Sequence, residues 1–344
     1  MNNIIIIGSG WFGLHAYLIL KEMNKDINII VLEKNNDIFN ESSNFNQNRL
    51  HLGYHYPRSH KTRKLCIEGY YKFVSKYREV IDFIDSNYYL ISNKSLIDYE
   101  TYLAIFNDIN YQHNIIKNNY FTEIDGNIIN TKEKIINSVK SKNYFKKKIK
   151  KSDIKLNYNV TKIVQKDNKV IINDDLECDL LIDCTYNRLN LSKKIYIYEL
   201  TISLMYKRLN FDNTFESITV MDGNFFSLFP REISKQKYTL THVKYTPLIK
   251  SSNLEDICNY NLEDKTLKEI IQNMENEVVK IYKDFKKDFI YESYFTSYKC
   301  KLDCNNDSRE CIIEKNENII SVNCGKIIGI FDFEDYLREN IKFY

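Results

Sequence analysis

The sequence predicts an α/β fold in which a parallel βαβ unit at the N-terminus and an inserted, mainly antiparallel β-sheet form two interleaved domains. Three observations lead to this prediction. An apolar strand, a glycine-rich turn and a helix pattern open the chain, and short apolar strands return at 179–185 and 319–323. Between them, alternating aromatic stretches are typical of an antiparallel sheet and lie at 195–207, 217–230 and 238–245. With 344 residues, the chain is also too long for one small core.

Composition excludes several classes of protein. The 49 basic residues nearly balance the 46 acidic ones, which argues against a nucleic-acid partner. The N-terminus lacks the basic region of a signal peptide, and no apolar run approaches the roughly 20 residues needed to cross a bilayer. We therefore expect a cytoplasmic protein without a membrane span. The eight cysteines form no C-x-x-C pair, so free thiols are expected rather than a metal site.

The first forty residues carry the strongest functional signal. A short β-branched run, Ile4–Ile7, suits a strand buried on both faces. The G-x-G-x-x-G pattern follows at once as Gly8-Ser9-Gly10-Trp11-Phe12-Gly13. A helix pattern comes next, and then a second apolar strand at 27–32 that Glu33 closes. This order is typical of a Rossmann-like dinucleotide-binding unit.

Each glycine of the turn has a physical task in such a unit. Gly8 allows the tight turn out of the strand, and Gly10 lets the backbone approach a pyrophosphate. Gly13 permits close packing of the helix against the strand. The alternative is a βαβ unit that merely packs.

Residues beside the glycines complete the expected site for the ADP half of a dinucleotide. Trp11 and Phe12 begin the helix, where exposed N–H groups and the positive dipole hold anionic phosphates. Glu33, followed by Lys34, would accept hydrogen bonds from the adenosine ribose hydroxyls. That role favours a ribose without a phosphate.

A polar segment at 41–59 indicates which dinucleotide is expected. It is rich in hydrogen-bond donors and contains the pair Ser42-Ser43 and a His-x-Gly step at His51. The segment resembles the loop after the second strand in FAD-dependent oxidoreductases of the D-amino-acid oxidase and glycerol-3-phosphate dehydrogenase type, the DAO-like superfamily. The run 48–58 is similar to a bacterial and viral branch of that superfamily. Nicotinamide-dependent dehydrogenases normally lack such a loop.

The resemblance covers most of the chain and implies FAD as cofactor, held by a glutathione-reductase-like domain. A strand ending in Cys184-Thr185-Tyr186 is similar in part to a family strand that ends in Ala-Thr-Gly near the flavin. A C-terminal strand, glycine and helix resemble the unit that packs against the flavin, with Gly325 and Gly329 in that role. The expected cofactor-binding residues are Gly8, Gly10, Trp11, Phe12, Gly13, Glu33, Lys34, Ser42, Ser43, Arg49, Leu50, His51, Thr185, Gly325 and Gly329.

Periodicity and the resemblance together divide the chain. Apolar residues at helical spacing predict helices over 62–83, from about 131 to 150 with Thr131 as N-cap, and over 262–289. The FAD-binding domain is expected over 1–84, 129–190 and 305–344, and the substrate domain over 85–128 and 191–304.

The resemblance further implies oxidation of a carbon that bears a hydroxyl or an amine, in a small polar and often anionic substrate. FAD accepts the hydride, so the protein must orient the substrate and remove a proton. An arginine fork can clamp a carboxylate or phosphate. The candidate anchors are Arg49, Arg58, Arg231, Lys244 and Arg309. The electron acceptor does not follow from the sequence.

Histidine is the expected proton acceptor near neutral pH. His51 has the best position, in the flavin-proximal loop, and His55 follows it closely. His242 shares a strand face with Lys244 and is a candidate base only if that face lines the flavin.

Three function classes stay open. The first is an FAD-dependent dehydrogenase or oxidase. The second is a flavoenzyme without net redox change, such as a sugar-ring mutase acting on a nucleotide sugar, although the His-x-Gly loop and the C-terminal segment count against it. The third is a flavin-binding protein without catalysis.

Overall fold

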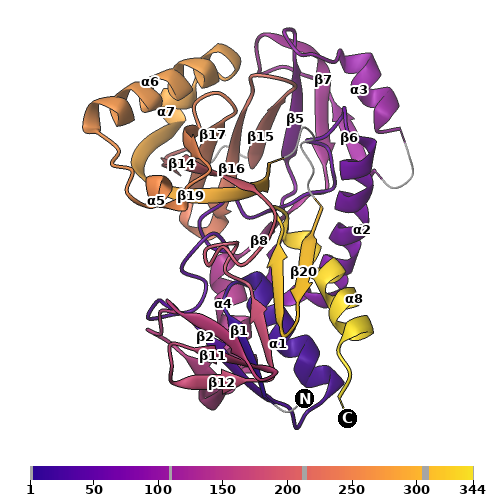
Figure 1. Cartoon of the computed structure of the whole chain (residues 1–344). Coiled ribbons are helices and arrows are strands. Elements are labelled where there is room, and N and C mark those ends of the chain that lie inside the picture. The colour runs from indigo at the N-terminus through magenta and orange to yellow at the C-terminus, as the bar shows by residue number, and fades with distance from the viewer. Residues whose placement is uncertain (1–2, 108–110, 211–214, 304–309, 344) are drawn as a thin grey trace.

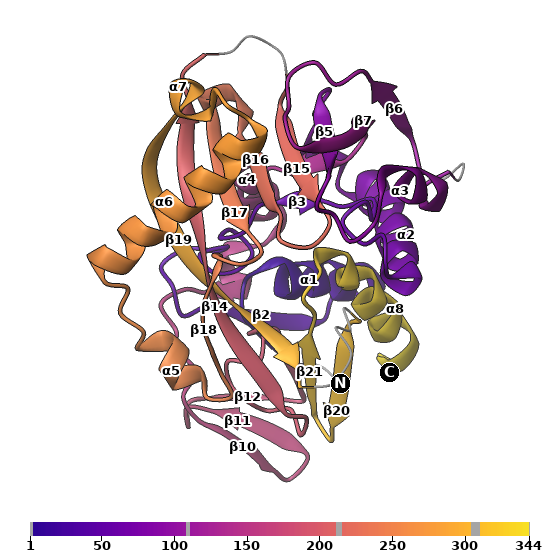
Figure 2. The same cartoon turned by 90° about the horizontal axis from the view of Figure 1, so that it is seen from above.

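The computed structural model describes residues 3–107, 111–210, 215–303 and 310–343. Two large sheets occupy the two halves of the molecule, as Figures 1 and 2 show from two directions. One is parallel and carries the N-terminal βαβ unit, and the other is mainly antiparallel. The predicted α/β class is therefore confirmed.

The first sheet has six strands, and all neighbouring pairs are parallel except the pair at one edge. Its apolar run Ile4–Ile7 is buried on both faces, because helix α1 (Trp11–Met23) covers one side and a small hairpin sheet the other. The strand order is β20 (Ile312–Asn316), β21 (Ile319–Asn323), β13 (Leu180–Asp183), β1 (Asn3–Ile7), β2 (Asn28–Leu32) and β9 (Ile154–Lys155).

The parallel arrangement brings four separate turns to one edge of this sheet. Gly8 follows β1, Glu33 follows β2, Cys184 follows β13 and Cys324 follows β21. In open α/β sheets, ligands bind outside the carboxyl ends of the strands. This carboxyl edge is therefore the place to look for a site.

The second sheet has nine strands, of which β15 and β5 form a parallel pair. Helix α6 (Asp264–Ile281) packs on one face through Met274, Val278 and Ile281, and Figures 1 and 2 show it on the outer side. The strands are β5 (Asn87–Ser92), β6 (His113–Ile116), β7 (Ile124–Thr131), β14 (Tyr196–Arg208), β15 (Ser217–Met221), β16 (Phe226–Glu232), β17 (Lys237–His242), β18 (Pro247–Ser251) and β19 (Phe289–Leu302).

Smaller elements connect the two halves. A three-stranded sheet of β3 (Arg49–Leu50), β8 (Lys134–Ile136) and β4 (Ile81–Asp82) joins segments from both. A hairpin sheet holds β10 (Ile163–Lys166), β11 (Lys169–Ile172) and β12 (Leu176–Cys178). The other helices are α2 (His60–Lys76), α3 (Tyr99–Ile105), α4 (Ser138–Lys148), α5 (Leu254–Cys258), α7 (Phe285–Asp288) and α8 (Ile330–Asn340), with 3₁₀ turns η1 (Arg78–Val80), η2 (Lys151–Asp153), η3 (Ile233–Lys235) and η4 (Ile327–Gly329). Within the described ranges, no helix is both long and apolar enough to cross a membrane.

All three expected helices differ from the structure. The helix predicted over 62–83 ends at Lys76, and the turn η1 and the strand β4 follow it. Thr131 does not cap a helix but ends β7, and α4 begins only at Ser138. The cap is Asn137, whose side chain accepts a hydrogen bond from the Lys140 amide. The predicted helix over 262–289 is two helices, because the chain breaks after Ile281. The strands follow the expected interleaving, whereas the exact domain bounds stay a prediction.

Candidate active site

The turn after β1 has no room for side chains. Gly8 has a φ of +98°, and a Cβ there would lie 2.8 Å from the carbonyl oxygen of Cys184. A Cβ on Gly13 would lie 1.9 Å from the carbonyl oxygen of Gly8, so helix and turn are in backbone contact. A Cβ on Gly10 would lie 2.5 Å from Ser43 Oγ. The backbone therefore requires glycine at positions 8 and 13, whereas at position 10 the close atom belongs to the Ser43 side chain.

Helix α1 points the start of its dipole at this turn. Its N-cap is Gly10, which offers no capping side chain, and the Trp11 amide donates to Ser43 Oγ over 3.0 Å. The Trp11 ring itself is buried, and Phe12 is half-buried. The start of the helix thus faces the carboxyl edge, where a phosphate would take the place of Ser43 Oγ at the Trp11 amide.

Glu33 holds the glycine turn from the neighbouring strand. Its Oε2 accepts hydrogen bonds from the Ser9 amide (3.0 Å) and the Ser9 hydroxyl (2.6 Å). Its Oε1 accepts two from Asn35, both 2.9 Å. A ribose would therefore share a carboxylate that already orders the turn. Lys34 pairs with Glu41 in the loop that follows.

The other expected cofactor residues lie around the same edge. Ser42 Oγ donates to the Tyr298 carbonyl (3.4 Å), and the Tyr298 hydroxyl donates to the Thr185 carbonyl (3.2 Å). Gly325 has open space, since its added Cβ would meet only the Tyr186 hydroxyl at 3.9 Å. Gly329 precedes α8 and packs against Cys324. Glycine turn, uncapped helix and serine loop thus fit a dinucleotide, while the role of each residue stays a prediction.

Arg49 lies between the two halves of the molecule. Only 5% of it is exposed, and its guanidinium donates to the hydroxyls of Tyr89 (3.0 Å), Thr219 (2.7 Å) and Ser227 (2.8 Å). It also stacks 4.0 Å from the Phe229 ring centroid. Its neighbour Leu50 is fully buried. Arg49 therefore ties the polar loop to the second sheet.

Two histidines of this loop meet a buried carboxylate. The rings of His51 and His55 lie 4.7 Å apart, and His51 Nδ1 is 3.7 Å from Oε1 of Glu133. Glu133 is fully buried; its Oε1 accepts the Leu52 amide (2.7 Å) and its Oε2 accepts the Tyr89 hydroxyl (2.7 Å). The same Tyr89 oxygen is 2.5 Å from His55 Nδ1. Sequence reasoning missed Glu133, because nothing beside it in the chain marks it.

This cluster has strongly perturbed proton affinities. Burial, with added repulsion from Arg49 and His51, holds the pKa of His55 well below its usual range. Burial and the charge of Glu133 raise the pKa of Tyr89 well above its usual range. His55 is therefore a neutral base at physiological pH. Perturbed groups of this kind concentrate at functional sites.

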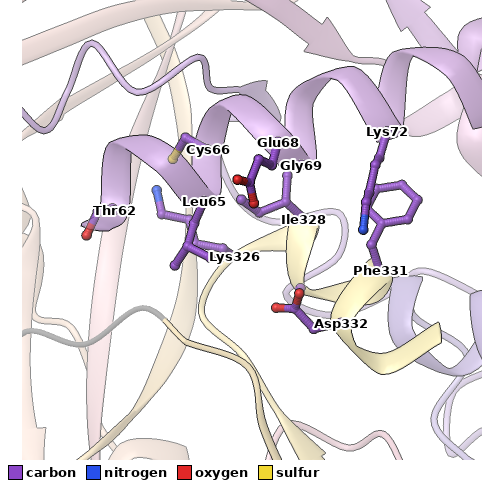
Figure 3. A pocket seen from close by; sticks show the side chains of 11 residues that line it. Thr62, Leu65, Cys66, Glu68, Gly69, Lys72, Lys326, Ile328, Phe331 and Asp332 are labelled. Atoms are coloured by element: carbon purple, nitrogen blue, oxygen red, sulfur yellow. The ribbon is translucent and has the colours of Figure 1, made fainter. Parts of the chain in front are cut away.

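Lys326 joins the C-terminal segment to the histidine loop. Its ammonium lies 4.3 Å from the ring centroid of Tyr56 and hydrogen-bonds the Tyr56 hydroxyl. The Tyr56 ring is 6.1 Å from that of His51 and 6.2 Å from that of His55. Figure 3 shows Lys326 at the side of a cavity between α2 and the start of α8. The histidines thus border the carboxyl edge.

Two arginines expected as anchors have protein partners. Arg58 is exposed and donates through Nε to Asp222 (2.7 Å). Arg231 donates to the Asn46 carbonyl (3.0 Å) and to Asn44 (2.8 Å). Arg309 lies outside the described residues. Substrate binding by these arginines stays a prediction.

His242 and Lys244 line another cavity, beside α6, but they do not share a strand face as expected, because β17 ends at His242 and Lys244 lies in the turn that follows. His242 pairs with Phe226, and alternation places both on the face of the second sheet that α6 covers. Arg49 contacts the opposite face through Thr219 and Ser227. His242 thus faces away from Arg49, and its role as a base stays a prediction.

No protein-family model matches the chain. It is 29% identical over 332 residues to the FAD-dependent monooxygenase FPY4 of Fusarium mangiferae, covering 95% of this chain and 87% of that protein. FPY4 is fungal, so the expected bacterial and viral branch stays a prediction.

Solved structures share the fold at low sequence identity. Glycine oxidase from Geobacillus kaustophilus superposes with a TM-score of 0.69 at 8% identity, covering 98% of this chain and 94% of the other. L-α-glycerophosphate oxidase from Mycoplasma pneumoniae, solved with FAD bound, gives 0.71 at 13% identity, covering 99% and 96%. These matches show the fold, and the similarity to FPY4, an FAD-dependent monooxygenase, bears out the prediction of an FAD-dependent oxidoreductase.

Proposed function

We propose that this chain is an FAD-dependent oxidoreductase that oxidises a CH–OH or CH–NH carbon of a small anionic substrate. One observation carries the proposal. His51, His55 and Lys326 converge beside the sheet edge that holds the glycine turn. When bound, FAD supplies the acceptor for the substrate's hydride.

The histidines provide the base. His55 is neutral because burial and Arg49 lower its pKa, and His51 has a side chain that is 21% exposed. Either imidazole can accept the hydroxyl or ammonium proton of a substrate while the C–H bond faces the cofactor.

Lys326 provides the anchor for the anionic group. Within the described residues, its ammonium is held by the neutral hydroxyl and ring of Tyr56 rather than by a carboxylate. Arg58 is already paired with Asp222, and Arg231 with loop carbonyls. A substrate carboxylate or phosphate beside Lys326 would gain a charge-assisted hydrogen bond.

The first test is the visible spectrum of the purified protein before and after acid precipitation. A two-band yellow spectrum released into the supernatant supports non-covalent flavin, whereas a colourless protein that takes up no added FAD overturns the proposal. Small hydroxy and amino acids are then screened for anaerobic bleaching of the band.

The anchor is tested once a substrate bleaches the flavin. Lys326→Met should raise KM for the anionic substrate far more than for its neutral amide or ester. The matched control is Lys72→Met, because Lys72 lines the same cavity but pairs with Asp335. Equal effects of the two variants would contradict the anchor role.

A monooxygenase is the second candidate, since FPY4 carries that name. In that reaction one oxygen atom of O₂ enters the product and the other leaves as water. Turnover under ¹⁸O₂ separates the two: label in the product supports a monooxygenase, and release of hydrogen peroxide with an unlabelled product supports an oxidase.

A further inference from the structure

We infer that Glu133 and Tyr89 are positioning residues for the two histidine rings: they fix His55 as the Nδ1–H tautomer, with Nε2 as its proton-accepting atom, and they place the Glu133 carboxylate beside His51. The catalytic use of these rings rests on the proposed function, but the tautomer itself does not. Neither residue was among the candidates that the sequence indicated.

The direction of the hydrogen bonds decides the tautomer of His55. Glu133 is surrounded by donors, namely the Leu52 amide and the Tyr89 hydroxyl at 2.7 Å each, with Arg49 Nη1 at 3.7 Å. The carboxylate oxygens accept the hydrogen bonds from Leu52 and Tyr89. The Tyr89 proton must therefore point at Glu133, and the Tyr89 oxygen is left as an acceptor.

The remaining contacts of that oxygen agree with this assignment. Arg49 Nη1 donates to it over 3.0 Å, and His55 Nδ1 lies 2.5 Å from it. A hydroxyl oxygen has two lone pairs, so it accepts one bond from Arg49 and one from His55. The 2.5 Å contact therefore places a proton on His55 Nδ1, and it outweighs the 3.5 Å approach of Arg49 Nη1, which would need Nδ1 as an acceptor. Its Nε2 holds the free lone pair and can receive a proton from a substrate.

Glu133 acts on His51 without an intermediary. His51 Nδ1 lies 3.7 Å from Oε1, which is too far for a hydrogen bond, so Glu133 acts on this ring through its charge. When His51 or His55 takes up a proton, the buried negative charge of Glu133 stabilises the imidazolium, directly or through Tyr89. A buried carboxylate that orients an imidazole in this way is a recurring catalytic device.

A metal ion is the competing use of the same atoms. Donor atoms of His51, His55 and Glu133 lie within 4.8 Å of one another. The Arg49 guanidinium, however, is 3.7 Å from Glu133 Oε2 and 3.5 Å from His55 Nδ1. A divalent cation would have to displace the donors that already occupy Glu133 and face a fixed positive charge. The charges therefore favour a proton-handling cluster.

Tautomers are measured directly by long-range ¹H–¹⁵N NMR on ¹⁵N-histidine-labelled protein without added FAD. Wild-type His55 should show the Nδ1–H pattern, and Tyr89→Phe should abolish or reverse it. The matched control is Tyr88→Phe on the same strand, whose side chain packs on the opposite face of the sheet. An Nε2–H pattern in the wild type, or no change in Tyr89→Phe, would overturn the inference.

Kinetics provide the second readout. Glu133→Gln keeps the shape and the acceptor for Leu52 but removes the charge. We expect kcat to fall at least about tenfold, with little change in KM and a lower apparent pKa for the base in the pH profile. The pH profile also depends on the positive charges of Arg49 and Lys326 and on the repulsion between the two histidines. An unchanged kcat and pH profile would overturn the role of Glu133.

Two outcomes distinguish this inference from the proposed function and from a metal site. If the protein turns over no substrate but the tautomers follow Tyr89 as expected, the proposed function fails and the positioning stands. If chelator-treated protein binds stoichiometric Zn²⁺ in a ZnCl₂ titration, and Glu133→Gln abolishes that binding, the cluster is a metal site and the inference fails.

Discussion

The glycine turn and the histidine loop border the same sheet edge but are built in different ways. The turn at Gly8–Gly13 depends on its own backbone, with Glu33 from the next strand as its main side-chain support. The histidine loop depends on side chains far away in the chain, above all Glu133 and Tyr89. The first region needs the absence of side chains, and the second needs particular side chains in a buried polar network.

This difference determines how each region responds to change. Overlap in the turn is steric and cannot be relieved, because backbone meets backbone at Gly13. In the network, removal of one group leaves the charge or the hydrogen-bonding atom of another group without its partner. The effects of two such substitutions on stability are therefore not additive.

The largest expected effect is that of Gly13→Ala. The new methyl group would overlap the Gly8 carbonyl oxygen, 1.9 Å away, so we expect the free energy of unfolding to fall by roughly 4 kcal/mol and flavin to be lost. Gly325→Ala is the control for stability, because its Cβ meets nothing closer than 3.9 Å. Urea unfolding measures both variants and flavin content measures Gly13→Ala, and equal stability of the two variants would contradict a backbone-built turn.

Arg49→Met tests the network side of the comparison. It leaves the buried Glu133 without its nearest positive charge, and we expect a loss of about 3 kcal/mol of stability. If the stranded charge causes the loss, Arg49→Met combined with Glu133→Gln should be more stable than Arg49→Met alone. A double-mutant cycle by urea unfolding decides, and strictly additive effects would show that the two residues are independent.

The same contrast explains what the sequence could predict. G-x-G-x-x-G and the acidic residue after β2 lie within a short stretch, so spacing alone located Gly8, Gly13 and Glu33 at one edge. Glu133 sits between β7 and β8, far along the chain from His51. Glu133 and His51 come together only where the two halves of the molecule meet. His242 shows the same limit of sequence-based prediction. Alternation of residue types predicted a strand around His242, but it did not predict which face of the sheet α6 covers.

Glu33→Ala separates two roles of one carboxylate. We expect FAD binding to weaken by about 1–3 kcal/mol, the usual cost of lost charge-assisted hydrogen bonds. Ser9→Ala removes the hydroxyl that Glu33 holds but keeps the carboxylate. A larger effect of Glu33→Ala in fluorescence titrations of the apoprotein indicates a direct contact with the cofactor. Equal effects would mean that Glu33 acts only by ordering the turn.

The smallest expected effect concerns ion pairs between the loop after β2 and helix α4. Asp37 lies 2.8 Å from both Lys142 Nζ and Lys146 Nζ. Burial alone would raise the pKa of Asp37, but hydrogen bonds from the two lysines and the Ile38 amide lower the pKa to about 2. A pKa below the unfolded value of about 3.9 stabilises the fold above that pH, and this contribution is lost as the pH falls toward 2.

Asp37→Asn should therefore lower the free energy of unfolding at pH 7 by less than about 1 kcal/mol, and Tm slightly, because the three side chains are partly exposed. The difference from wild type should shrink between about pH 5 and pH 2, as scanning calorimetry can follow. Asp26→Asn, an exposed change on the loop before β2, is the control and should show no such window. If the difference in stability between Asp37→Asn and wild type did not depend on pH, the shape of the Asp37 side chain rather than its charge would be what matters. Steric fit would then govern this contact, as it governs the glycine turn.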